Sequence, residues 1–165
     1  MHPESMAQMT KILDGWRGRQ PASVLDVGAY DVNGCYRGMV TARGWSYIGL
    51  DLLDGPNVDV VCPQPYTWPI ADGAFDIVIS GSTLEHVEMP WLWIIEAARV
   101  LRPGGLLAVI THTRFALHRH PVDCWRVMPD GMRVLFDLTD CLRDYDIQMY
   151  CETDISGVAY KDLGR

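Results

Sequence analysis

The sequence predicts an α/β fold: a doubly wound, mostly parallel sheet with helices on both of its faces. Short apolar runs alternate with amphipathic stretches along the chain, as they do in repeated strand-helix-strand units. The run at residues 75–80 is almost continuously apolar, which is typical of a parallel strand covered on both sides. Two other runs end at Gly28 and at Asp51, residue types that suit ligand-binding turns at the carboxyl ends of such strands.

The individual elements follow from periodicity and from residues that stop helices. Apolar side chains at helical spacing over residues 5–16 predict a helix before the first strand. A second helix should end at Gly44, and a third at Pro103 and the two glycines that follow it. We expect helices at 5–16, 34–43, 90–101 and 129–136, strands at 24–27, 47–50, 58–61, 75–80 and 106–111, and closing strands near 145–151 and 157–163.

The third of these helices carries an apolar stripe at spacings of three and four residues. Such a stripe predicts the face that a helix buries against a sheet. We therefore expect the following side chains in the core: Trp91, Ile94, Ile95 and Ala98.

Length and composition predict one domain. The chain has 165 residues, of which 48% are hydrophobic, so it holds enough apolar material for one sizeable core. We expect a single domain over residues 1–165, with an N-terminal helix in 1–20, a cofactor-binding core in 21–112, and a substrate loop with closing strands in 113–165.

Charge and cysteine usage exclude several classes of protein. The net charge of −7 disfavours broad binding to nucleic acid, because a phosphate backbone repels it. The five cysteines are scattered and form no C-x-x-C pair, which argues against a disulfide framework or a zinc knuckle and favours a reducing, cytoplasmic setting. The apolar runs fall short of the roughly 20 residues that span a bilayer, so we expect no membrane association.

The pair Gly28 and Asp51 predicts a cofactor that contains a nucleoside. Their separation is close to the ~20 residues of a strand-helix-strand unit, which places a glycine turn and a carboxylate at neighbouring strand tips. A glycine there gives a ligand access to the backbone, and a carboxylate can accept hydrogen bonds from a ribose diol.

The residues around Gly28 disfavour a nicotinamide dinucleotide. A dinucleotide fingerprint has the pattern G-x-G-x-x-G, which seats a pyrophosphate on a helix N-terminus. Here Tyr30 stands in place of the second glycine, and the acids Asp26 and Asp31 flank it. Negative charge would oppose a pyrophosphate and favour a cation, so a nicotinamide-dependent oxidoreductase is the less favoured alternative.

Five segments in this order resemble the class I S-adenosylmethionine-dependent methyltransferases, and within them the methyltransferase type 11 group. They are Asp26-x-Gly28, Gly49-Leu50-Asp51, Trp68-Pro69-x-x-Asp72-Gly73-x-Phe75-Asp76, Leu84-Glu85-His86-Val87 and Arg99-Val100-Leu101-Arg102-Pro103-Gly104-Gly105. The resemblance implies a Rossmann-like methyltransferase sheet of seven strands, or slightly fewer, and an enzyme that uses S-adenosyl-L-methionine.

The resemblance also implies roles for single residues. Asp51 would bind the ribose hydroxyls, and Leu52 would pack on the adenine. Gly28, with Ala29 and Tyr30, would face the methionine portion of the cofactor. The chain departs from the family pattern at the later glycines of the loop, where Asn33 and Gly34 would supply the turn, and at Gln64, which stands where an acid often caps the adenine amino group.

Other residues near the strand ends have two interpretations. Ser80, Gly81 and Ser82 would either floor the pocket near the methyl donor or simply connect a strand to a helix. Tyr66 would either set an aromatic face against adenine or fill the core. The candidate cofactor-binding set is Asp26, Gly28, Ala29, Tyr30, Asn33, Asp51, Leu52, Gln64, Tyr66, Ser80, Gly81 and Ser82.

The segment from Thr111 to Arg126 carries the candidate catalytic residues. It follows the fifth strand, where the substrate loops of such sheets lie. His118 could act as a base with Asp123 as its orienting partner, and the alternative is a structural clamp in which Asp123 pairs with an arginine. His86 would contact the substrate or act as a base, or else bond locally at a helix start.

The same segment also offers metal-ligand types in the pattern His118-x-His120-x-x-Asp123. Nothing else in the sequence supports a metal site, and we predict none. We expect methyl transfer to a small-molecule or carbohydrate-like acceptor, and the arginines and histidines after the fifth strand favour an anionic one. The alternative from another class is a non-catalytic module that binds S-adenosylmethionine or S-adenosylhomocysteine.

Overall fold

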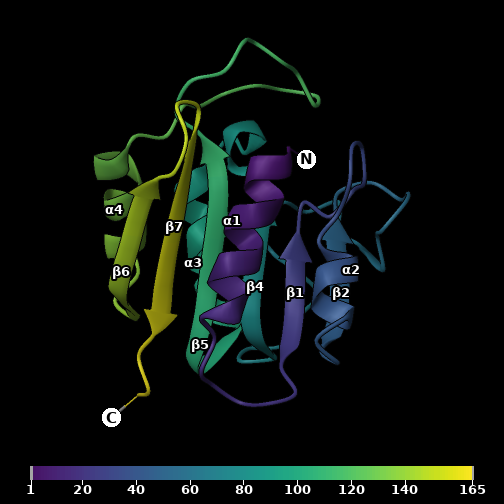
Figure 1. Ribbon diagram of the computed structural model, residues 1–165, viewed down its shortest axis with the longest axis vertical. Helices are drawn as coiled ribbons and strands as arrows, with labels where there is room; N and C mark the ends of the chain where they lie inside the picture. Colours follow the sequence, from purple (N-terminus) through teal and green to yellow (C-terminus); the bar gives the residue numbers. More distant parts are fainter. Residues whose placement is uncertain (1, 165) are drawn as a thin grey trace.

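One seven-stranded sheet organises the protein (Figure 1). The computed structural model describes residues 2–164 and has the strand order β3-β2-β1-β4-β5-β7-β6. The strands are β1 (Ser23–Val27), β2 (Ser46–Asp51), β3 (Val60–Val61), β4 (Phe75–Gly81), β5 (Leu101–His112), β6 (Leu142–Met149) and β7 (Asp154–Lys161). The helices are α1 (Pro3–Asp14), α2 (Arg37–Thr41), α3 (Pro90–Val100) and α4 (Pro129–Asp137), with a 3-10 turn η1 (Leu84–His86).

The predicted doubly wound, mostly parallel sheet is confirmed. β1, β2, β3, β4 and β5 pair in parallel, and β7 runs antiparallel to both β5 and β6. Strand order reverses between β1 and β4, because the chain builds outward through β2 and β3 before it returns to the other side of β1. A reversal of this kind opens a crevice at the carboxyl ends of the strands.

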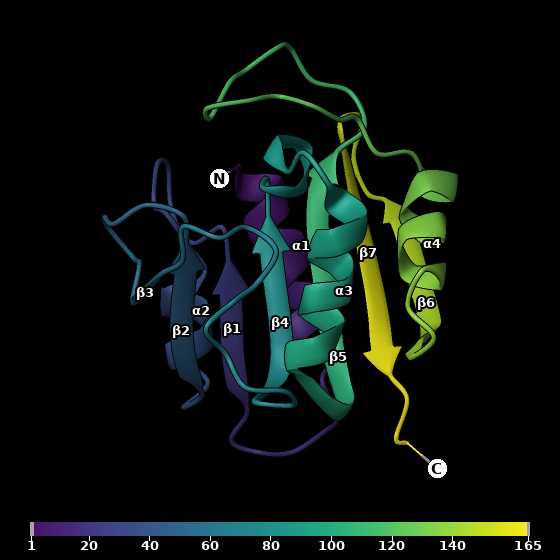
Figure 2. The same cartoon turned by 180° about the vertical axis from the view of Figure 1, so that it is seen from behind.

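Each face of the sheet has its own apolar core. Helices α1 and α2 cover one face (Figure 1), and α3 with α4 covers the other (Figure 2). Met9, Leu13 and Val40 pack from the first pair of helices, and Ile94 and Phe136 pack from the second. Within residues 2–164, no helix combines the length and the apolar character that crossing a bilayer requires.

Several predicted boundaries differ from the structure. The helix expected at 34–43 spans only Arg37–Thr41, because the Asp31 carboxylate accepts a hydrogen bond from Gly34 N (2.6 Å) and holds the preceding residues in a loop. Strand β5 begins at Leu101, whereas the sequence predicts this strand only from residue 106, after Gly104 and Gly105. The pairing shifts register after Leu101, so the Pro-Gly-Gly segment bulges from the strand edge instead of separating a helix from a strand.

The predicted buried face of α3 is right for two residues and wrong for two others. Ile94 and Ala98 are buried, whereas Trp91 is 41% exposed and Ile95 is 47% exposed. The helix packs through Trp93 and its neighbours instead. Apolar residues surround much of this helix, so periodicity alone did not identify the face that meets the sheet.

Lys161 of β7 caps the carboxyl end of α3 and so connects a strand of the sheet to a helix that covers one of its faces. Its ammonium group donates to the carbonyl oxygens of Ala98 (2.8 Å) and Leu101 (2.7 Å). The last carbonyls of a helix lack partners within the helix, and a cation there also compensates the helix dipole.

Replacing Lys161 should therefore destabilise the fold. Lys161→Met keeps the apolar stem but removes the charged donor, and we expect a loss of about 1–3 kcal/mol in the free energy of unfolding. Arg19→Met, which removes a cation from an exposed position in the loop before β1, is the control and should cost less than about 0.5 kcal/mol. Urea denaturation of the two variants checks this, and equal midpoints would show that the cap contributes nothing.

Candidate active site

A cavity of about 850 Å³ opens at the carboxyl ends of the parallel strands. Its wall comes from the loops after β1, β2 and β4, from the end of β5, and from the segment at 115–122 that passes over them. Volumes of about 300–1,000 Å³ are usual for small-molecule sites. The predicted location of the ligand crevice agrees with the position of this cavity.

Gly28 forms the turn at the tip of β1 and tolerates no side chain. Its φ is +81°, and a Cβ atom at this position would lie 2.1 Å from Oγ1 of Thr83. Its amide and that of Ala29 both donate to the carbonyl of Leu50, at 2.9 and 3.1 Å. The backbone at this tip is therefore brought close to both neighbouring strands and left accessible to a ligand.

Asp51 lies at the tip of β2 with its carboxylate held in place by two backbone amides. Tyr30 N donates to Oδ2 (3.0 Å), and Leu53 N donates to Oδ1 (3.3 Å). The side chain lines the cavity and is only half-buried. Since an ionised carboxylate has about four acceptor positions, the group can still accept hydrogen bonds from a ligand diol.

The loop after Gly28 lacks the family's later glycines and is held by other contacts. The ring of Tyr30 packs against Gly55, because a Cβ atom on Gly55 would lie only 2.2 Å from Cε2 of Tyr30. Asn57 Nδ2 donates to the carbonyl of Ala29 and to the hydroxyl of Tyr47, both at 2.7 Å. A contact network between the loops after β1 and β2 thus replaces the usual glycine turn.

Asp26 is a buried acid beneath this loop. Tyr47 Oη donates to its Oδ2 at 2.6 Å. Burial raises the pKa of Asp26 to about 7, the Tyr47 hydrogen bond opposes that rise, and the nearby charge of Asp51 adds to it. Asp26 also lines the cavity, so its charge bears on which ligand the loop accepts.

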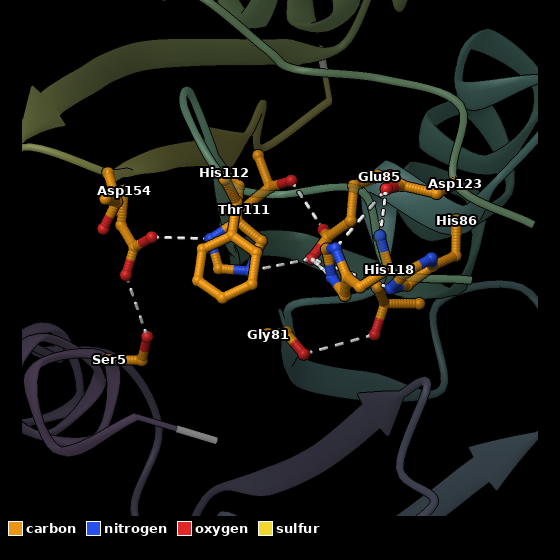
Figure 3. A network of polar contacts seen from close by, with 12 residues as sticks. Ser5, Gly81, Glu85, His86, Thr111, His112, His118, Asp123 and Asp154 are labelled. Atoms are coloured by element: carbon orange, nitrogen blue, oxygen red, sulfur yellow. Dashed lines mark hydrogen bonds and ion pairs between the residues drawn. The ribbon is translucent and has the colours of Figure 1, made fainter. Parts of the chain in front are cut away.

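A cluster of imidazoles lines the other half of the cavity, and the buried carboxylate of Glu85 lies next to them (Figure 3). Glu85 is fully buried, and its Oε2 accepts a hydrogen bond from Thr111 Oγ1 (2.7 Å). Its Oε1 has no hydrogen-bond partner among residues 2–164 and lies 3.3 Å from His112 Nε2 and 3.9 Å from His118 Nε2. His86 Nε2 lies 4.0 Å from the same oxygen.

His112 is oriented by the strand pairing. It stands opposite Asp154 in the β5-β7 register, and its Nδ1 lies 2.6 Å from Asp154 Oδ1. Its ring stacks on Phe115, with centroids 4.5 Å apart. Burial alone would lower the pKa of His112, but the hydrogen bond to Asp154 and the charge of Glu85 outweigh burial and raise that pKa.

Asp123 is held by Arg126 and does not line the cavity. The guanidinium of Arg126 donates to both carboxylate oxygens, at 2.6 and 2.8 Å, and His118 N donates to Oδ2 at 2.7 Å. The Arg126 hydrogen bond, together with that from His118 N, holds the pKa of Asp123 well below its usual range. Asp123 Oδ2 also lies 3.4 Å from His118 Nδ1, so the geometry accommodates both the clamp with Arg126 and the role of orienting partner to His118.

His118 and His86 both line the cavity, and the Nδ1 atom of each ring is hydrogen-bonded to a backbone carbonyl. His118 Nδ1 lies 3.0 Å from the carbonyl of Ala116, and His86 Nδ1 lies 2.6 Å from the carbonyl of Val122. A carbonyl only accepts, so each Nδ1 carries its proton and each neutral ring presents the Nε2 lone pair. Both rings direct that nitrogen toward Glu85 (Figure 3).

Comparison with known proteins places the fold and the site in a family. The methyltransferase domain family matches residues 25–109, which is just over half of the chain and includes the tips of β1, β2 and β4. The chain belongs to this family. It is a class I methyltransferase domain, and S-adenosylmethionine is the cofactor of the family.

One curated relative is the malonyl-[acyl-carrier protein] O-methyltransferase of Hahella chejuensis, which is 40% identical over 60 residues. That stretch covers 33% of this chain and 22% of the relative, so the likeness spans less than a quarter of the relative's length.

Solved structures show the same fold. An S-adenosylmethionine-dependent methyltransferase from Archaeoglobus fulgidus superposes with a TM-score of 0.75 at 16% identity, covering 94% of this chain and 92% of that one. The 1,6-didemethyltoxoflavin-N1-methyltransferase of Burkholderia thailandensis, solved with S-adenosylhomocysteine, has a TM-score of 0.71 at 19% identity, over 96% and 78%.

The methyltransferase cavity gathers most of the predicted cofactor residues but not all. Gln64 is exposed and Ser80 is buried, and neither lines it. The hydroxyl of Ser80 donates to the carbonyl of Val27 (2.7 Å) and so joins β4 to β1. The predicted residues that line the cavity are Asp26, Gly28, Ala29, Tyr30, Asn33, Asp51, Leu52, Tyr66, Gly81 and Ser82.

The residues present fit S-adenosylmethionine. Gly28, where the side chain of Thr83 leaves no room for a Cβ atom, lines the cavity with its backbone. The Asp51 carboxylate keeps free acceptor positions at the neighbouring tip. Sequence reasoning missed Thr83, Glu85 and His112 as site residues. Glu85 belongs to the segment Leu84-Glu85-His86-Val87, which carries part of the family resemblance. The sequence signal that could have marked it as a site residue is an acid close to the end of a strand.

Removing the Asp51 carboxylate should weaken cofactor binding. Asp51→Ala loses a charge-assisted contact, and we expect S-adenosylhomocysteine to bind about ten- to a hundredfold more weakly, which corresponds to roughly 1.5–3 kcal/mol. Asp54→Ala, an exposed acid of the same loop outside the cavity, is the control and should bind as the wild type does. Calorimetric titration checks this, and equal affinities for the two variants would contradict the assignment.

The pKa of Asp26 predicts a stability that depends on pH. The unfolded chain releases this proton near pH 3.8 and the folded protein near pH 7, so the folded state binds more protons between these values. The contribution of protonated Asp26 is present at low pH and is lost as the pH rises to 7. The asparagine of an Asp26→Asn variant cannot ionise, so the variant does not lose stability in this way. The free energy of unfolding of the variant minus that of the wild type should therefore increase by about 4 kcal/mol between pH 4 and pH 8. A stability difference that stays constant over this range, measured by urea denaturation, would exclude the raised pKa.

Proposed function

We propose that this methyltransferase domain transfers the methyl group of S-adenosylmethionine to a small-molecule or carbohydrate-like acceptor, preferably an anionic one. The observation that carries the proposal is the division of one cavity into two chemically different halves. One half contains the Gly28 turn and Asp51, which suit the cofactor, and the other contains the imidazole cluster beneath Phe115. The second half is the acceptor half.

Enclosure favours a small acceptor. The segment at 113–126 arches above the carboxyl ends of the strands (Figures 1 and 2). It is tied to the η1 turn, because Cys124 N and Trp125 N donate to the carbonyl of Glu85 at 2.7 and 3.2 Å. A cavity of about 850 Å³ with this segment across its mouth suits a cofactor with a compact second molecule better than a polymer.

Basic side chains in the acceptor half favour an anionic group. Arg119, His118 and His120 all line the cavity, and Arg119 is exposed within a segment that crosses its mouth. A guanidinium matches a carboxylate or phosphate with two parallel hydrogen bonds. The overall charge of −7 makes this local concentration of basic groups more selective, because distant acids repel an anion elsewhere on the surface.

Positioning carries most of the catalysis that we propose. Bound S-adenosylmethionine supplies an electrophilic methyl group, and the protein's task is to align an acceptor atom with it. His118 lines the acceptor half and is the proposed catalytic residue, acting through Nε2 either directly as a base or through an ion bound to it, with His86 beside it at a ring distance of 4.8 Å. The Asp123-Arg126 pair positions His118 through its backbone amide.

His118→Gln should separate this function from a role in folding. We expect the variant to keep its melting temperature and its affinity for S-adenosylhomocysteine within about twofold, while transfer of labelled methyl groups falls by about 10² or more. The assay uses labelled S-adenosylmethionine with pools of sugar phosphates and carboxylic acids. Asp123→Asn should instead melt earlier, because Arg126 loses its charged partner.

Two results would contradict the proposal. A wild-type protein that binds S-adenosylhomocysteine but labels no anionic acceptor would favour the alternative of a non-catalytic binding module. A His118→Gln variant with normal transfer would remove His118 from the chemistry.

A further inference from the structure

In the imidazole cluster, hydrogen-bond acceptors face one another with no donor from the described part of the chain between them. His112, like His118 and His86, donates a hydrogen bond from Nδ1 to an oxygen. For His112 the acceptor is the carboxylate of Asp154, at 2.6 Å. The neutral form of each ring therefore presents the lone pair of Nε2. These nitrogens converge on Glu85 Oε1, which is itself an acceptor and has no hydrogen-bond partner among residues 2–164. Acceptors that face one another in a buried site are unfavourable unless a proton or a metal cation lies between them.

The spacing of three of these atoms suits a metal ion. The ligand atoms of Glu85, His112 and His118 all lie within 4.8 Å of one another. Two ligands that each bind an ion at about 2.1 Å with a tetrahedral angle are about 3.4 Å apart. The distance from Glu85 Oε1 to His112 Nε2 is 3.3 Å, and that to His118 Nε2 is 3.9 Å, which a small rotation of the less buried His118 would shorten.

Each of these side chains also has the outer partner that metal ligands usually have. Asp154 accepts from His112 Nδ1, the carbonyl of Ala116 accepts from His118 Nδ1, and Thr111 donates to the second oxygen of Glu85. Such contacts fix the tautomer and the direction of each ligand atom. A single shared proton would satisfy one nitrogen at most and would leave the lone pair of the other facing the carboxylate.

We propose that Glu85, His112 and His118 bind a divalent first-row transition-metal ion at the floor of the acceptor half. Two imidazole nitrogens and one carboxylate oxygen suit zinc, iron, cobalt or manganese better than the oxygen-seeking calcium and magnesium. The pattern differs from the one that the sequence offered. Asp123 is taken by Arg126, and the ring of His120 lies 6.2 Å from that of His118.

An ion with three protein ligands keeps an open position for a further ligand, and the two histidines of this set line the cavity. Its use in methyl transfer rests on the function proposed above: an oxygen of the acceptor would bind the ion and be held in place for the cofactor. Binding of the ion itself depends only on the three side chains.

Direct metal titration tests the proposal. After treatment with a chelator, the full chain is titrated with Zn²⁺ in a calorimeter and with Co²⁺ by visible absorption. We expect one ion per chain, with Co²⁺ bands typical of a site with nitrogen and oxygen ligands. His118→Gln and Glu85→Gln should each weaken binding at least tenfold. His120→Gln removes a histidine from the same cavity but outside the cluster, and it should bind within about twofold of wild type.

Absence of stoichiometric binding in the wild type would overturn the proposal, as would equal losses in His118→Gln and His120→Gln. Glu85 is fully buried, so if Glu85→Gln does not fold, the comparison of the two histidine variants decides. The test is independent of methyl transfer. Metal binding without transfer would contradict the proposed function alone, and transfer with no metal binding would contradict the metal site alone.

Discussion

The parallel pairing of β1 with β2 and with β4 is the constraint on which the rest of the structure depends. Asp26 stands opposite Gly49 on one side and Ile79 on the other, so the three strands end at the same edge. This register brings Gly28 against Thr83 and within reach of the β2 tip. A slip of one residue would invert every side chain of a strand and would separate the glycine turn from its neighbours.

The sequence predicted that the residues after β1 and β2 gather at one edge of the sheet, because their determinants are local. Gly28 and Asp51 each follow an apolar run directly, and the order of strands in a doubly wound sheet is restricted by rules of handedness and connection. Family likeness added the cofactor. The departures at the glycine loop were visible in the sequence, but the compensating contacts of Asn57 with Ala29 and Tyr47 depend on a loop conformation that no local pattern encodes.

The acceptor half was harder to predict, since its residues meet only after the chain has closed. His112 finds Asp154 through the antiparallel register of the last strands, whose boundaries the sequence located poorly. Glu85 meets His118 because the loop after β5 folds back over η1. A one-dimensional pattern paired His118 with Asp123, which lies 3.4 Å from it, but did not indicate the approach of Glu85 from the preceding turn. Similarly, the apolar residues of α3 gave no unique buried face.

The first helix belongs to this half of the site as much as the histidines do. Ser5 donates to Asp154 Oδ2 (3.4 Å), and Gln8 donates to Ser156 (2.9 Å), so α1 is joined to β7 directly behind His112. Only two polar contacts separate a surface helix from a ring in the cavity. In protein engineering, a substitution of Ser5 would therefore act on His112 through Asp154, and so on the half of the cavity proposed for the acceptor, although Ser5 does not line that cavity.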